Sequence, residues 1–173
     1  MTLKPFALAV MVFLIFSEGA SALSCMRPDL AATMEQAKSS EKHYYVLVGR
    51  FQTDTPSQPT PPHSNQFETR PSTVERGWFD GYMLTPNEQT DYQLFRLPID
   101  IETSCAGPWC GSAPSPEREH VAFVEARPNQ IPILRISACP EWVYNIGPNQ
   151  GEIKTLRGCF DKPCKSKPSP KIR

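Results

Sequence analysis

No stretch of the sequence carries a catalytic motif with an assignable chemistry. The chain has no G-x-S-x-G nucleophile elbow and no C-x-x-C redox pair. Its three histidines (43, 63 and 120) are scattered, and none has a second histidine or a carboxylate at the spacing of a zinc site. We therefore predict that the protein is not an enzyme and that it has no cofactor and no metal site.

The chain also lacks an excess of charge of either sign. Its 18 Lys and Arg side chains balance 18 Asp and Glu, which gives a formal net charge of zero. Proteins that bind nucleic acid need a basic surface, because most of their affinity comes from the phosphates. The balance predicts no nucleic-acid partner.

The long apolar run is confined to the N-terminus. Lys4 precedes the apolar residues 5–16, and Ala20-Ser21-Ala22 has the pattern of a cleavage site. This run is too short to span a bilayer comfortably. The pattern predicts a signal peptide over residues 1–22 and a secreted or periplasmic protein.

A second interpretation exists at the end of this leader. The sequence Ala22-Leu23-Ser24-Cys25 resembles a lipobox, in which Cys25 would be acylated. Ala22 stands where a lipobox usually has Leu, and Glu18 lies close upstream, so we favour simple cleavage. A membrane partner is expected only if Cys25 is lipidated.

What remains after the leader is about 150 residues, the size of one domain. Its 19 prolines argue against long helices. The six cysteines of an exported chain predict three disulfides, for which sequence alone allows about 15 pairings. The cysteines are residues 25, 105, 110, 139, 159 and 164.

Short apolar segments separated by turns predict one helix followed by strands. Asp29 can cap a helix within residues 28–40. A proline-rich polar loop is expected over 53–76, a short strand or loop over 153–156, and a basic, proline-rich tail over 159–173. This pattern indicates an all-β barrel or sandwich with one short N-terminal helix. The expected strands are 44–51, 77–85, 91–103, 120–125 and 131–137.

Two groups of side chains have competing interpretations. Five aromatic residues could form a surface on which sugars or bases stack, but we favour core packing for them. His120 opens a strand and is expected at the barrel rim. The aromatic residues are Trp78, Phe79, Tyr82, Tyr92 and Phe95.

Several motifs occur in an order that resembles the netrin-module family, to which the tissue inhibitors of metalloproteinases (TIMPs) belong. Cys25-Met26-Arg27-Pro28 is similar to the family's N-terminal cysteine motif and is followed by the strand-like YYVLVGRF. Cys110-Gly111, HVAFVE, ARPNQ and ILRISAC then follow in the family's order. The resemblance implies an OB-fold, a five-stranded barrel with helical flanks, over residues 23–158.

The resemblance also implies a set of disulfides. In the family, the second N-terminal cysteine is joined to the cysteine after the last of these strands, which corresponds to Cys25–Cys139 here. Leu23 stands where the family has its first cysteine, so the accompanying bonds become Cys105–Cys110 and Cys159–Cys164. A set with Cys25–Cys110 and Cys139–Cys159 is the alternative.

The function implied is binding through the N-terminal segment. In the inhibitors, the α-amine and carbonyl of the N-terminal cysteine chelate the catalytic zinc of the protease. The corresponding partner-binding residues here are Leu23, Ser24 and Cys25, with Trp109 in the turn before Cys110. We expect an exported binding or inhibitory module with an extracellular or periplasmic metalloprotease as its partner. The alternative is a structural or envelope-associated protein without inhibitory activity.

Overall fold

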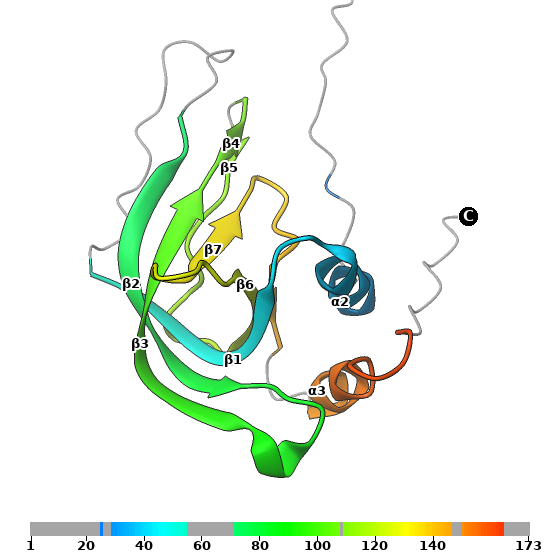
Figure 1. Cartoon of the computed structure of the whole chain (residues 1–173). Coiled ribbons are helices and arrows are strands. Elements are labelled where there is room, and N and C mark those ends of the chain that lie inside the picture. The colour runs from blue at the N-terminus through cyan, green and yellow to red at the C-terminus, as the bar shows by residue number, and fades with distance from the viewer. Residues whose placement is uncertain (1–24, 26–28, 55–70, 108, 147–149, 165–173) are drawn as a thin grey trace, which may run out of the picture.

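The protein is a closed barrel with two helices packed on its outside (Figure 1). The computed structural model describes residues 25, 29–54, 71–107, 109–146 and 150–164. Neighbouring strands run in the order β1-β2-β3-β7-β6, and β6 pairs back onto β1. All neighbours are antiparallel except β3 and β7. The strands are β1 (Tyr44–Thr53), β2 (Thr73–Met83), β3 (Tyr92–Thr103), β6 (His120–Glu125) and β7 (Ile133–Ile136). This is the OB-fold-like, disulfide-bonded β-barrel that we predicted.

The barrel interior is filled by side chains that alternate along the strands, as a pleated sheet requires. The rings of Phe51 and Phe79 pack against each other with their centroids 5.0 Å apart. A single apolar cluster therefore holds all five strands. Its buried members are Leu47, Phe51, Phe79, Ile99, Ile101, Ala122, Val124, Leu134 and Ile136.

Two glycines allow β1 and β2 to approach closely inside the barrel. Gly49 and Gly81 face each other in the register of the two strands. A Cβ atom on Gly49 would lie 2.2 Å from the carbonyl oxygen of Asp80, which no side chain tolerates. Gly49 is thus a point of close backbone contact between β1 and β2.

A second apolar layer lies between the barrel and the helices α2 (Leu30–Ser39) and α3 (Gln150–Arg157). The short strand β8 (Val143–Asn145) pairs with β6 and leads toward α3. Trp142 packs against both apolar clusters and so joins the two layers. The buried members of the second cluster are Met34, Val46, Val48, Leu84, Val121, Phe123, Ile146, Ile153, Leu156 and Cys159.

Helix α2 lies within the range predicted for it. Its N-terminus is capped by the Asp29 side chain, which accepts a hydrogen bond from Ala31 N. At its other end, Lys38 Nζ donates to the carbonyl oxygen of Cys159 at 2.8 Å, and Cys164 N donates to Glu35 at 2.9 Å. Residues 159–164, which were predicted to belong to the tail, therefore pack onto the domain.

The structure differs from the sequence prediction in two elements. Residues 153–156 belong to α3, where Ile153 and Leu156 point one face of the helix into the second apolar cluster. Strand β2 begins at Thr73, so residues 73–76 are part of the sheet and not of the proline-rich loop. Residues 55–70 of that loop and 165–173 of the tail lie outside the described residues.

The five aromatic residues are divided between core and surface. Phe79 is fully buried and Tyr82 is partly buried, but Trp78, Tyr92 and Phe95 are exposed. A bulge in β3 explains why Phe95 is exposed. Arg96 in this bulge adopts a φ of 51°, and its backbone N–H donates a hydrogen bond to Asp80 Oδ1. The prediction of core packing is therefore wrong for Trp78, Tyr92 and Phe95.

Candidate functional site at the end of strand β7

The three disulfides are Cys25–Cys139, Cys105–Cys110 and Cys159–Cys164. This is the set that the resemblance implies, and the alternative set is not formed. Three disulfides are consistent with an oxidising or extracellular compartment. The first bond spans 114 residues of sequence and joins Cys25 to the chain that follows β7.

Cys25 is exposed and is held just beyond the end of β7. Its partner, Cys139, lies three residues after the last residue of that strand. The Ser137 hydroxyl donates to Cys139 O at 2.6 Å and accepts from Cys139 N at 3.2 Å. The backbone at Cys25 is thus anchored to a turn that is itself held by hydrogen bonds. Leu23 and Ser24 lie outside the described residues.

A small hairpin stands beside the same end of β7. Its strands β4 (Cys105–Ala106) and β5 (Trp109–Cys110) pair with each other and are closed by the second disulfide. Trp109 is 46% exposed on this hairpin. The described residues of the turn include Gly107, whose φ of +58° suits glycine.

The base of the hairpin is fixed to β7 by backbone contacts. Ser104 N donates to Ile136 O, and Gly111 N donates to Ser104 O, each at 2.9 Å. A Cβ on Gly111 would lie 2.5 Å from Ile136 O, so only glycine allows this approach. The hairpin and the turn that holds Cys25 are therefore both fixed to the last residues of β7.

Cys25 and the hairpin that carries Trp109 are thus both attached to the chain at the end of β7. We call this region, made of Cys25, Cys139 and the hairpin 105–110, the β7-end edge. Sequence reasoning identified Cys25 and Trp109 but did not assign roles to Gly111 and Ser137. The glycine directly after Cys110 was the available signal for Gly111.

The edge has the character of a protein-contact surface. An exposed indole on a short cross-linked hairpin offers a large apolar area that loses little conformational entropy on binding. Among the described residues, no group of three or more His, Cys, Asp or Glu side chains is placed to hold a metal ion. No helix in the described part of the chain is long and apolar enough to cross a membrane.

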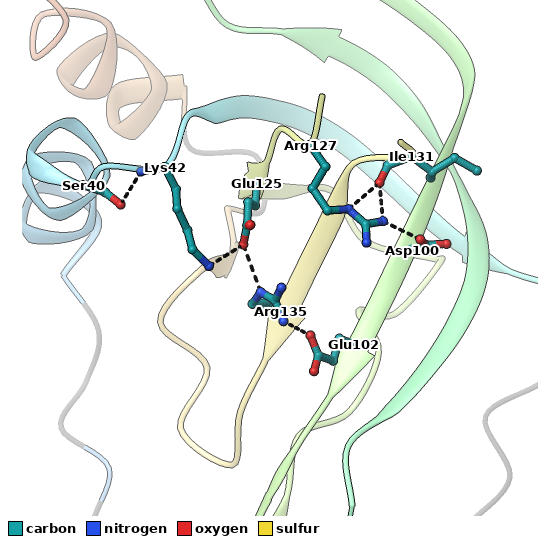
Figure 2. Close-up of polar contacts among 8 residues, drawn as sticks. All are labelled: Ser40, Lys42, Asp100, Glu102, Glu125, Arg127, Ile131 and Arg135. Carbon is teal, nitrogen blue, oxygen red and sulfur yellow. Dashed lines mark hydrogen bonds and ion pairs between the residues drawn. The ribbon is translucent and has the colours of Figure 1, made fainter. Parts of the chain in front are cut away.

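Paired charges cover the outer face of β3, β6 and β7 (Figure 2). Arg135 bonds to Glu102 and Glu125, and Lys42 also bonds to Glu125. In a second group, Asp100 accepts from Arg76 and Arg127. Burial raises the pKa of Asp100, but its hydrogen bonds to the two arginines outweigh this, and the net pKa is lowered. These charges satisfy one another, so this face offers less to a ligand than the β7-end edge.

His120 opens β6, as predicted, and its side chain is only 6% exposed. It pairs with Gly49 of β1 and Asn145 of β8 and is not one of the residues of the β7-end edge.

No protein-family model, no curated protein and no solved structure matches this chain.

Proposed function

We propose that the protein is an exported binding module that inhibits a zinc metalloprotease through its β7-end edge. The observation that carries the proposal is the joint anchoring of Cys25 and of the Trp109 hairpin to the end of β7. An anchored Cys25 and an exposed tryptophan, both attached at the end of one strand, suit an inhibitor that inserts its N-terminus into an active site. The leader-like residues 1–22 support export.

The chemistry resides in the residue that becomes the mature N-terminus. An α-amine has a pKa near 8, and once it is unprotonated it can bind Zn²⁺ together with the adjacent carbonyl oxygen. Cleavage after Ala22 would leave two residues ahead of the anchored Cys25. Cleavage after Ser24 would make Cys25 itself the N-terminus, with its backbone held by the Cys139 bond. The second form would lose less entropy on binding and would inhibit more strongly.

Trp109 would supply the contact next to the zinc-binding terminus. Buried tryptophans at the centre of an interface typically contribute about 2 kcal/mol or more, which is about a 30-fold change in affinity. The proposal therefore expects Trp109→Ala to weaken inhibition about 30-fold without unfolding the barrel. Trp109 lies outside both apolar clusters.

The test begins with the exported protein, whose N-terminus is mapped by mass spectrometry. Inhibition constants are then measured against a panel of extracellular zinc proteases, before and after acetylation of the α-amine. We expect acetylation to abolish inhibition and Trp109→Ala to weaken it. The matched control is Tyr92→Ala, which removes an exposed aromatic ring at the start of β3, far along the strand from the hairpin.

Three outcomes would contradict the proposal. Absence of inhibition by every form would leave the structural or envelope-associated alternative. Inhibition that survives acetylation would mean that the N-terminus does not bind the zinc. An acylated Cys25 in the exported protein would leave no free amine for this chemistry.

A further inference from the structure

His120 is a buried titratable side chain whose ring is only half satisfied. It begins β6 and stands opposite Gly49 of β1 and Asn145 of β8. The ring lies edge-on to Phe51, with the ring centroids 6.3 Å apart. Its Nδ1 is buried and has no hydrogen-bond partner in the described part of the chain. The backbone of Arg118 also acts on the ring.

The surroundings of this ring favour its neutral form. Burial lowers the pKa of His120 below its ordinary value of 6.5. The hydrogen bond to the Arg118 backbone opposes this change, whereas the positive charge of Arg118 adds to it. Gly49 and Phe51 of β1 and Asn145 of β8 carry no charge. No carboxylate among the described residues acts on the ring.

The position of His120 matters because β8 is a short strand attached along one edge. Three residue pairs join it to β6: His120 with Asn145, Val121 with Tyr144, and Ala122 with Val143. One more bond, from Ile146 N to Glu119 O at 3.3 Å, extends this attachment. His120 is the β6 residue at the end of the attachment from which the chain continues toward α3.

Ile146 connects this attachment to the helical layer. It is buried in the second apolar cluster together with Ile153 and Leu156 of α3. Opening of the β6–β8 pairing at His120 would therefore withdraw Ile146 and loosen the packing of α3.

We propose that His120 makes the attachment of β8 to the barrel acid-sensitive. Protonation adds an N–H at Nδ1, where no acceptor is available, and places a positive charge beside Phe51. The charged ring is accommodated when the pairs at Asn145 and Ile146 open and water reaches it. This inference does not depend on metalloprotease inhibition.

The direction of the pH effect follows from linkage. In the closed form the pKa of His120 lies below 6.5, and in the opened form it returns toward 6.5. Above pH 6.5 both forms are neutral, and the attachment has its full stability. Below pH 6.5 the opened form binds the proton more strongly, so each pH unit increases its population up to about tenfold, until the pKa of the closed form is reached.

The experiment is amide hydrogen exchange between pH 7.5 and 5.0 on the full exported chain, with rates corrected for intrinsic exchange. We expect the opening constant at the Ile146 amide to rise several-fold to tenfold per pH unit below 6.5. The Leu84 amide, which bonds to Val46 O at 2.8 Å within the barrel, should not respond. Asp91 and Asp100 have lowered pKa values and titrate below this window.

Two variants separate His120 from the other histidines. His120→Leu removes the titrating ring and should abolish the pH response at Ile146. The variant that carries both His43→Gln and His63→Gln keeps His120 as its sole histidine and should respond as the wild type does. In that second variant, the ring of His120 can be titrated directly by NMR, so the test does not depend on the folding of His120→Leu.

Two results would overturn the inference. One is an Ile146 pH response in His120→Leu equal to that of the wild type. The other is a His120 ring that titrates at or above pH 6.5 while the Ile146 amide stays protected.

Discussion

The contact between α3 and the β2–β3 turn is a bidentate ion pair whose removal should measurably destabilise the fold. Arg157 Nη1 donates to Asp91 Oδ1 at 2.8 Å and to the carbonyl oxygen of Thr85 at 2.7 Å. Its Nη2 donates to Asp91 Oδ2 at 2.7 Å. The two side chains are only 16% and 14% exposed. We predict that Asp91→Asn lowers the free energy of unfolding by about 2 kcal/mol at pH 7.

This magnitude lies between two measured classes of ion pair. Exposed pairs contribute about 0.2–1 kcal/mol, and breaking a fully buried pair costs about 3–5 kcal/mol. The bidentate geometry and low exposure place Arg157–Asp91 between them. Asparagine keeps the shape of Asp91 and still accepts one bond, so the substitution isolates the loss of charge at Arg157.

The assay is urea unfolding of the wild type and the variant at pH 7. The matched control is Arg76→Gln, because the Arg76 side chain is 51% exposed and Asp100 keeps its bond to Arg127. We expect the control to cost less than about 1 kcal/mol. If Asp91→Asn costs no more than Arg76→Gln, then the ion pair does not stabilise α3 on the barrel.

Acid provides an independent check of the same pair. The hydrogen bond from Arg157 is the main cause that holds the pKa of Asp91 below its ordinary value of 3.8. Because the folded-state pKa is lowered, the contribution of this carboxylate is complete above pH 3.8 and is lost as the pH falls through the folded-state pKa. The stability difference between wild type and Asp91→Asn should therefore shrink below pH 3.8. An unchanged difference at pH 2 would contradict this assignment.

Further predictions concern the barrel and its disulfide. Gly49→Ala should destabilise the protein by about 3 kcal/mol or more in urea unfolding, because its Cβ would meet Asp80 O at 2.2 Å; an effect below about 1 kcal/mol would mean that the strands separate easily. The double variant Cys25→Ser and Cys139→Ser should lose at most about 5 kcal/mol on the chain-entropy model and should melt at a lower temperature. An unchanged melting temperature would mean that the bond does not constrain the unfolded chain. Gly111→Ala should displace the hairpin and shift the Trp109 fluorescence, and a spectrum like that of the wild type would show that the hairpin tolerates a side chain there.

The elements predicted most accurately are those in which the pattern of apolar residues in the sequence matches the burial of these residues in the structure. Residues 120–125 were expected as a strand, and β6 has those same bounds because every one of its residues is buried and most are apolar. Strand β1 was found for a related reason, since its β-branched and aromatic residues suit both apolar clusters. Cys25 and Trp109 of the candidate site were predicted from the family resemblance. Rules of residue spacing alone would not have identified them.

The errors arose where long-range contacts decide the outcome. Ile153 and Leu156 are too few to distinguish a strand from a helix, and the helix forms because its apolar face meets a layer supplied by α2 and β1. The glycine that follows α3, Gly158, was a helix-termination signal that we did not use. Core packing was predicted for Phe95 as one of five aromatic residues, but the left-handed Arg96 shifts the register of β3, and the Phe95 ring is exposed. Burial of His120 depends on β8, which periodicity did not identify as its neighbour.

The Cys25–Cys139 bond also determines how the molecule would bear mechanical force. A pull on the chain ahead of Cys25 would pass through the disulfide directly to the end of β7. While the bond is intact, α2 and β1 lie inside the loop that it closes and so are not on the covalent path of that load. Reduction would redirect the force into α2 first. A tether on the N-terminal side of Cys25 is therefore connected through the disulfide to the end of β7. Whether this disulfide is oxidised or reduced decides which element unfolds first under force.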